Sequence, residues 1–219
     1  MPKPAPPRLM GALAWLHVDE SLVAVNKPAG LLSVPGRGPE NADCALSQVL
    51  QRFPEARVVH RLDMGTSGIL IFARHLAAQQ ALSRAFETRQ TDKRYEAIVS
   101  GLIHADQGEV KLALRCDWPN RPRQMVDPEQ GKPALTRWQV MARDPTDQTS
   151  RVALYPVTGR SHQLRVHMQA LGHAIVGDEL YAAPEVAEAS PRLLLHAAQL
   201  ALPHPSTGQR FVVECPTPF

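Results

Sequence analysis

Apolar positions recur in short runs bounded by turn-forming residues, and this pattern predicts more strands than helices. The expected strands are residues 21–26, 68–74, 94–100, 109–114, 135–142, 151–157 and 210–215. Helical spacing appears at 42–53, 76–89 and 161–171, with Ser161 as the expected N-cap of the third helix. Because strands and helices do not alternate regularly, we expect an α+β fold with a mixed or antiparallel sheet. Residues 116–133, rich in proline and polar residues, are expected to be a binding loop or linker.

Composition allows one large domain or two small ones, since 219 residues that are 44% hydrophobic can bury a sizeable core. The net charge of +3 permits an anionic partner without identifying one. Cys44, Cys116 and Cys215 are odd in number and far apart, so neither a disulfide framework nor paired zinc knuckles is expected. We interpret all three as core or surface thiols.

The N-terminal segment contains an apolar run at residues 9–16 with the length of a signal-peptide core. Its small residues lie inside the run, and charged residues follow where a cleavage site would belong, so we do not interpret it as a signal. No segment approaches the roughly 20 apolar residues that span a bilayer, and a cytoplasmic location is expected. We expect a flexible tail over residues 1–14 and a single domain over residues 15–219.

The segment His60-Arg61-Leu62-Asp63 places two charged residues directly before the turn-forming sequence GTSG and a predicted strand. A carboxylate on a loop that enters a buried strand can be held at the rim of the sheet and face a cleft, where catalytic groups often lie. The alternative is structural: Asp63 would cap the tight turn, and Arg61 would be a solvated neighbour.

Arg165 lies in the third predicted helix between Leu164 and Val166, which indicates that its side chain is partly buried. A buried guanidinium requires an anion, since an unpaired buried charge costs several kcal/mol. Asp63 is one candidate, and the pair would keep its carboxyl ionised and oriented. The other acidic residues, out of 21 in the chain, remain alternatives.

Lys93, Arg94 and Tyr95 begin a predicted strand behind a helix end that carries Arg84 and Arg89. Basic side chains interleaved with an aromatic ring suit a phosphate backbone and a stacked base. The same tyrosine is also compatible with half-buried packing at a strand start, so this motif alone does not identify RNA as a partner.

Other chemistries find little support in the sequence. His162 and His167 are five residues apart, whereas the histidines of a zinc-protease helix are four apart around a glutamate, so no metal site is expected. GTSG is one residue short of a hydrolase nucleophile elbow, and HRLD is accompanied by neither the glycine-rich loop nor the DFG motif of a kinase. Without a Walker or dinucleotide motif, no cofactor is expected.

Five segments taken together resemble the RluA-type pseudouridine synthases in order and spacing. They are VNKPAGLLSVPG (25–36), HRLDMGTSGILIFA (60–73), KRYEAIV (93–99), GRSHQLRVHM with LGHAIVGDELY (159–168 and 171–181), and RLLLHA (192–197). The resemblance extends over about residues 20–216. It implies a bent mixed, largely antiparallel sheet flanked by helices and loops, with a catalytic cleft across the sheet. It also implies the isomerisation of uridine to pseudouridine in structured RNA, a reaction that needs neither metal nor redox cofactor.

The resemblance further implies residue roles. Asp63 matches the essential catalytic aspartate, Arg165 the arginine that pairs with it, and Tyr95 the aromatic residue that packs on the target base. Leu195 matches the apolar floor beside that base. The reaction detaches uracil, turns it and rejoins it to the ribose. Asp63 is therefore expected either to attack the anomeric carbon or to remove the adjacent sugar proton.

Contacts to RNA are expected around this centre. A stacked base cannot react, so it must be extruded, and we expect Arg61, with His60 beside it, to contact or fill the vacated space. Phosphate contacts that make binding salt-sensitive are expected from Arg84, Arg89, Lys93, Arg94, Arg121 and Arg123.

The expected substrates follow from the same resemblance. The chain is expected to carry no separate N-terminal RNA-binding module, because its first matching motif begins at Val25. It resembles the short family members that modify a 23S rRNA stem-loop and a tRNA anticodon stem-loop. These RNAs are the expected partners, with no protein partner and a monomeric state. Two alternatives stay open: a non-catalytic RNA-binding or chaperone protein that keeps the synthase fold, and a metal-dependent RNA hydrolase.

Overall fold

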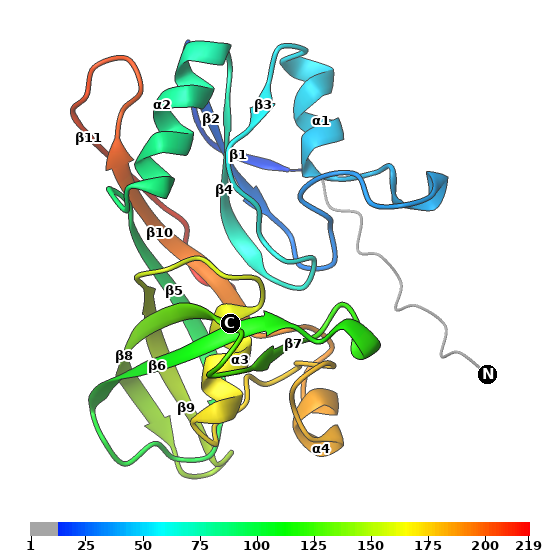
Figure 1. The fold of residues 1–219 in the computed structure, drawn as a ribbon, viewed down its shortest axis with the longest axis vertical. Helices are drawn as coiled ribbons and strands as arrows, with labels where there is room; N and C mark the ends of the chain where they lie inside the picture. Colours follow the sequence, from blue (N-terminus) through cyan, green and yellow to red (C-terminus); the bar gives the residue numbers. More distant parts are fainter. Residues whose placement is uncertain (1–12) are drawn as a thin grey trace.

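The folded chain is built on one continuous bent sheet (Figure 1). A computed structural model describes residues 13–219. The strands are β1 (Ala14–Val18), β2 (Leu22–Lys27), β3 (Arg57–Val58), β4 (Ser67–Ala73), β5 (Asp92–Ser100), β6 (Gln107–Cys116), β7 (Gln124–Val126), β8 (Lys132–Asp144), β9 (Thr149–Pro156), β10 (Leu195–Pro203) and β11 (Arg210–Glu214). Over these residues the order is β1-β2-β4-β10-β5-β9-β8-β6-β7, with β3 on β4 and β11 on β10. The pairing of β4 with β10 is parallel and the other strand pairs are antiparallel.

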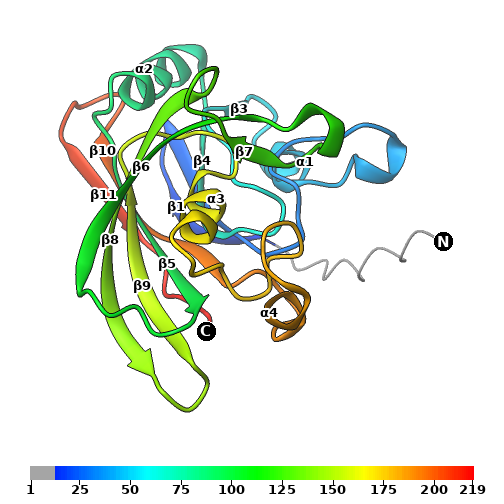
Figure 2. The same cartoon turned by 60° about the horizontal axis from the view of Figure 1, so that its bottom comes forward.

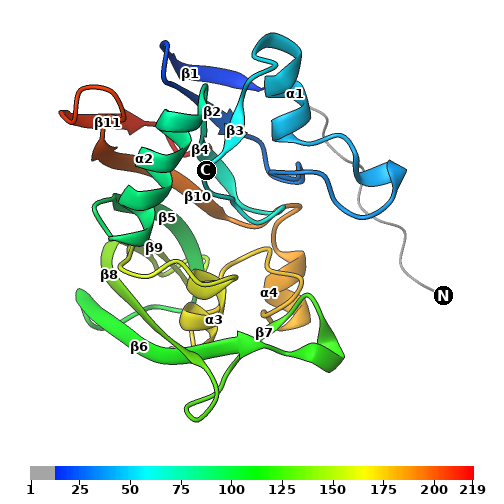
Figure 3. The same cartoon turned by 45° about the horizontal axis from the view of Figure 1, so that its top comes forward.

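The helices are α1 (Ala45–Arg52), α2 (Leu76–Glu87), α3 (Gln163–Ala170) and α4 (Pro184–Glu188). α1 and α2 accompany the N-terminal strands, whereas α3 and α4 lie with β5 to β9 (Figure 1). Figure 3 shows α2 alongside β10 and β4. α3 lies in the hollow of the bent sheet, where it contacts β6, β7, β8 and β9 (Figure 2). This position carries the side chains of α3 toward the centre of the molecule.

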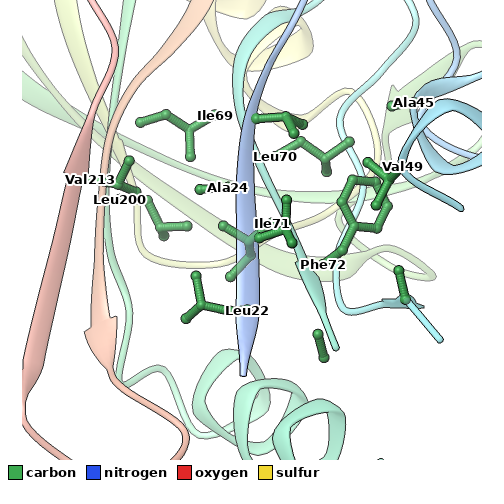
Figure 4. Packing of buried hydrophobic residues seen from close by; sticks show 14 of the residues in the cluster. Leu22, Ala24, Ala45, Val49, Ile69, Leu70, Ile71, Phe72, Leu200 and Val213 are labelled. Atoms are coloured by element: carbon green, nitrogen blue, oxygen red, sulfur yellow. The ribbon is translucent and has the colours of Figure 1, made fainter. Parts of the chain in front are cut away.

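Strand β4 is the best-buried element of the N-terminal half. All seven of its residues are buried, because the sheet continues on both sides of it and both of its faces are covered. Figure 4 shows Phe72 directed toward Val49 of α1, while Leu200 of β10 and Val213 of β11 lie on the other side of the cluster. Since the Asp63 loop leads directly into β4, the position of that loop is fixed by the core.

The structure confirms the predicted α+β class, and each predicted strand and helix is present. The first helix is shorter than predicted because it begins after Cys44, whose Sγ accepts from the Ser47 backbone N–H in a capping box. The prediction that Ser161 caps the third helix is wrong: the N-cap of α3 is His162, with a left-handed φ of 52°. Cys44 and Cys215 are buried free thiols, and Cys116 is half-buried.

Several elements were missed by the sequence patterns: β1, β3, β7, β10 and α4. β7 lies inside the segment expected to be irregular, and β10 contains three alanines, which weaken the strand signal. Residues 1–12 of the expected tail lie outside the described residues, while Leu13 is buried and Ala14 begins β1. No helix among residues 13–219 combines the length and apolar character needed to cross a membrane.

Gly68 is required by the close parallel pairing of β4 with β10. Its φ is 107°, and an added Cβ would lie 2.3 Å from the Ala197 carbonyl oxygen of β10. We expect Gly68→Ala to lower the free energy of unfolding by about 3 kcal/mol, since the backbone becomes strained and the strands must separate. Gly159→Ala is the matched control, because nothing lies within 4 Å of its added Cβ. Urea unfolding measures both, and equal midpoints would contradict the assignment.

Candidate active site

The surface of the molecule contains a cleft of about 1770 Å³. It is lined by the segment after β2, the loop that carries Asp63, the start of α3 and the segment before β10. A smaller adjoining pocket of about 110 Å³ is lined by the Asp63 loop, β5, α3 with the segment before it, and the first residue of β10. Among its lining residues are Arg61, Asp63, Tyr95, Arg165 and Leu195. The fold therefore gathers residues that are up to 134 positions apart, from Arg61 to Leu195, in one small pocket.

Asp63 lies on the loop between β3 and β4, and its side chain is 30% exposed. Its two carboxylate oxygens face different donors: Oδ1 is 3.9 Å from His162 Nε2, and Oδ2 is 4.0 Å from Arg165 Nη1. The Arg165 contact is a long ion pair, and both distances exceed that of a hydrogen bond. The turn contact that Asp63 makes is between backbones, from the Thr66 N–H to the Asp63 carbonyl. The Asp63 carboxylate therefore faces the pocket, and the alternative in which it caps the turn is wrong.

Arg165 is buried as predicted, with a side chain only 8% exposed. Its closest anion is Asp178, which the sequence pattern did not distinguish from the other acidic residues. Nε and Nη2 donate to the two oxygens of the Asp178 carboxylate at 2.7 and 2.6 Å, and Asp178 is fully buried. This bidentate pair neutralises the guanidinium and fixes its plane. Asp63 is thus a second, more distant partner, and the alternative left open by the sequence, pairing with another acidic residue, supplies the closer one.

Tyr95 and Leu195 supply apolar wall to the small pocket. They come from neighbouring strands, because β5 pairs with β10 and Tyr95 lies opposite Ala197. Burial, and next to it the negative charge of Asp63, raise the pKa of the Tyr95 phenol well above its usual value. Tyr95 therefore remains a neutral ring at physiological pH. Its position agrees with packing against a base.

Lys27 is a buried lysine beside the loop that carries Asp63, and in the sequence it appears only as part of the VNKPAG motif. Its Nζ donates to the carbonyl oxygens of Pro28, Leu31 and Met64 at 2.9, 2.8 and 3.1 Å. Since Met64 follows Asp63, this ammonium ties the loop to the end of β2. Burial lowers the pKa of Lys27 to about 7, although the charge of Asp63 opposes that shift.

His60 and Arg61 flank the pocket but differ in role. The His60 ring stacks on Phe86 with centroids 4.7 Å apart, and its Nε2 accepts from the Ile71 N–H at 3.1 Å. Burial, with a contribution from Lys93, lowers the pKa of His60 to about 3, so it is neutral and ties the loop to β4. Arg61 is exposed and lines both the cleft and the small pocket.

The predicted phosphate contacts divide into two groups. Arg89, Lys93 and Arg121 line the cleft, and the Arg121 guanidinium lies 4.5 Å from the ring centroid of exposed Trp118. The other three predicted contacts do not line the cleft. Arg84 is exposed on α2, Arg94 pairs with Glu96 at 2.6 Å, and Arg123 lies 5.5 Å from the Tyr181 ring centroid. Arg192, which was not among the predicted contacts, also lines the cleft.

The two histidines of the α3 segment make different contacts. His167 is fully buried, with Nδ1 2.9 Å from Thr136 Oγ1, and burial lowers its pKa to about 4. His162 instead faces Asp63. Among residues 13–219, no group of three or more His, Cys, Asp or Glu side chains is arranged to hold a metal ion.

Comparison with known proteins identifies the family. Residues 21–170 match the family model described as RNA pseudouridylate synthase. The chain belongs to this family, and it is an isomerase acting on RNA. It is 51% identical over 204 residues to the dual-specificity RNA pseudouridine synthase RluA of Pasteurella multocida, covering 93% of each chain. The relative of the same name from Escherichia coli strain K12 is 49% identical over 207 residues, covering 94% of each.

Solved structures support the same assignment of the fold. The human RNA pseudouridylate synthase domain containing 1 superposes with a TM-score of 0.80 at 33% identity, covering 94% of this chain and 84% of that one. The bent, largely antiparallel sheet expected from the sequence resemblance is therefore confirmed as the pseudouridine synthase fold.

The Arg165–Asp178 pair provides a test that separates folding from chemistry. Arg165→Met leaves the Asp178 carboxylate buried without its partner, and we expect a loss of about 3–5 kcal/mol in the free energy of unfolding. Adding Asp178→Asn should recover part of that loss, because the amide oxygen still accepts from the Leu180 and Tyr181 N–H groups. Urea unfolding measures the recovery, and no turnover should return with it. An equally unstable double variant would show that the pair is not the cause.

Proposed function

We propose that this protein converts selected uridines of folded RNA to pseudouridine, with Asp63 as the catalytic carboxylate. The observation that carries the proposal is the position of Asp63. It faces a small pocket walled by Tyr95 and Leu195, and a buried guanidinium lies 4.0 Å away. The rival in which the fold only binds RNA gives no reason for this arrangement.

The reaction needs one carboxylate and a closed space. The bond from ribose C1′ to uracil N1 breaks, the ring turns, and a bond from C1′ to C5 forms; the C5 proton is lost to water and N1 gains one. Asp63 either attacks C1′ as a nucleophile or removes the C2′ proton to give a glycal. In both routes charge develops on the sugar beside the Asp63 carboxylate, which stabilises it, and Arg165, 4.0 Å away, helps to hold that carboxylate in place. The apolar walls retain the detached uracil and exclude water while it turns.

The substrates are proposed from the relatives, which are named dual-specificity RNA pseudouridine synthases. We infer that this chain modifies a 23S rRNA stem-loop and a tRNA anticodon stem-loop, working as a monomer in the cytoplasm. Arg89, Lys93 and Arg121 in the cleft supply phosphate contacts, so binding weakens as salt rises.

Tritium release from uridine labelled at C5 tests the reaction and both substrates together. We expect the native protein to release tritium from the rRNA and the tRNA stem-loop in the presence of a chelator. Asp63→Asn keeps the shape of the side chain and removes its charge, so release should fall roughly 10³-fold or more while RNA affinity stays near native. Tritium release from only one of the two RNAs would refute dual specificity. Strand scission, or RNA binding without tritium release, would refute the proposed synthase activity.

Arg61 is proposed to enter the space that the extruded uridine leaves, since it is exposed at the mouth of the pocket beside Asp63. A planar guanidinium can stack between bases and recover part of the unstacking cost. We expect Arg61→Ala to lower kcat/KM on an intact stem-loop about 10–100-fold and to affect an unstructured oligonucleotide much less. Arg57→Ala, which removes an exposed arginine outside the cleft, is the control. If Arg61→Ala modified the intact stem-loop at the native rate, this role of Arg61 would be refuted.

A further inference from the structure

A chain of hydrogen bonds runs from β7 to the side chain that faces Asp63. The backbone N–H of Gln124 donates to the Tyr181 hydroxyl at 2.7 Å. The Tyr181 hydroxyl lies 2.7 Å from Nδ1 of His162. The other ring nitrogen of His162, Nε2, is 3.9 Å from Asp63 Oδ1. Gln124, Tyr181 and His162 therefore form a series of contacts that ends at Asp63, the proposed catalytic carboxylate.

The partners of the Tyr181 hydroxyl determine which tautomer of His162 is favoured. The Gln124 N–H can only donate, so it occupies one acceptor site of the Tyr181 oxygen. If Nδ1 carried the ring proton, the hydroxyl proton would have no acceptor among residues 13–219, so the favoured state has Nδ1 accepting and the proton of the neutral ring on Nε2. Burial lowers the pKa of His162, and the nearby Arg165 adds to that effect, while Asp63 and Asp178 oppose it. A neutral ring with its N–H toward Asp63 is the consistent state.

We propose that His162 is a positioning residue that presents its Nε2–H to Asp63, with its tautomer set by Tyr181. This inference rests on the proposed role of Asp63 and adds to it a residue that neither the resemblance nor the comparisons assign. His162 and Arg165 face opposite oxygens of the carboxylate, at 3.9 and 4.0 Å. Two donors on two oxygens restrict rotation of the carboxylate about its last bond. Hydrogen bonds of this kind often reach full strength only when substrate closes the site.

The same tyrosine holds the second donor. The Arg165 guanidinium carbon lies 5.1 Å from the Tyr181 ring centroid, and the Tyr181 N–H donates to Asp178, the bidentate partner of Arg165. Tyr181 is only 4% exposed. Tyr181 thus holds both groups that face Asp63, through its hydroxyl, its ring and its backbone N–H, and this role requires no contact with substrate.

The backbone at His162 supplies an unusual test. Its φ of 52° is left-handed, a conformation in which asparagine is well tolerated. In His162→Asn the side-chain oxygen can replace Nδ1 as the acceptor for Tyr181, but nothing reaches Asp63. In His162→Gln the longer amide can place an N–H where Nε2 was. If the role of His162 were only structural, His162→Asn would be at least as active as His162→Gln. If His162 positions Asp63, His162→Gln should be the more active variant.

We expect His162→Asn to lower kcat about 100-fold and His162→Gln at most about 10-fold, with KM for the stem-loop near native in both. Thermal unfolding of each variant should give His162→Asn a midpoint temperature equal to or higher than that of His162→Gln. Tyr181→Phe, which keeps the ring and removes the hydroxyl, should lower kcat about 10-fold, again at native KM. An Asn variant as active as the Gln variant, or a loss confined to KM, would overturn the proposal.

Nitrogen-15 NMR of the histidine rings gives a readout independent of activity. In the native protein near neutral pH we expect the His162 ring to be neutral, with a protonated Nε2 and an unprotonated Nδ1. In Tyr181→Phe the ring should become a mixture of tautomers. A proton on Nδ1 in the native protein would refute the inference. If Asp63→Asn still released tritium, the proposed function would fail instead, so the two failures are distinguishable.

Discussion

The buried ion pair between Arg165 and Asp178 is the interaction on which the candidate site depends. Two carboxylate oxygens occupy the Nε and Nη2 edge of the guanidinium, so its charge is compensated before any substrate binds. The remaining Nη1 is left to face Asp63 at 4.0 Å. Had Asp63 been the only partner, a short hydrogen bond to the guanidinium would have occupied one of its oxygens. Because the main pairing is with Asp178, the Asp63 carboxylate faces the pocket with the Arg165 guanidinium 4.0 Å away.

The sheet explains how segments so distant in sequence reach this pair. β4 and β10 run parallel, and Gly68 lies against the Ala197 backbone, so the Asp63 loop and Leu195 arrive at the same end of the sheet. β5 continues the order on the other side of β10 and adds Tyr95. α3, lying in the hollow of the sheet, closes the pocket with Arg165 (Figure 2). The chemistry is therefore placed by strand order, and the hydrophobic core around β4 keeps it rigid.

The sequence predicted the strands with strong apolar runs and the residues inside recognisable motifs, and it missed what depends on tertiary pairing. β10 contains alanines of weak strand propensity and is a strand because β4, β5 and β11 all pair with it. Asp178 could not be singled out among the acidic residues, since its link to Arg165 exists only through the packing of the loop after α3. The GDELY motif was the available signal. The role of Lys27 likewise depends on hydrogen bonds from its Nζ to three backbone carbonyls, and no pattern of residue spacing predicts these bonds.

The groups around Asp63 form one arrangement, to which both residues predicted from the sequence and residues missed by it contribute. Lys27 ties the loop on one side, and Arg165 and His162 face the carboxylate on the other. None of these three donors lies within hydrogen-bond distance of the Asp63 carboxylate in the described chain, although all are held in place by other partners. Donors that are fixed in advance and aimed at a carboxylate cost no reorganisation when charge develops in the reaction. A site built this way uses its strong hydrogen bonds to hold the donors, and under the role proposed for Asp63 this leaves the carboxylate free to act on the sugar.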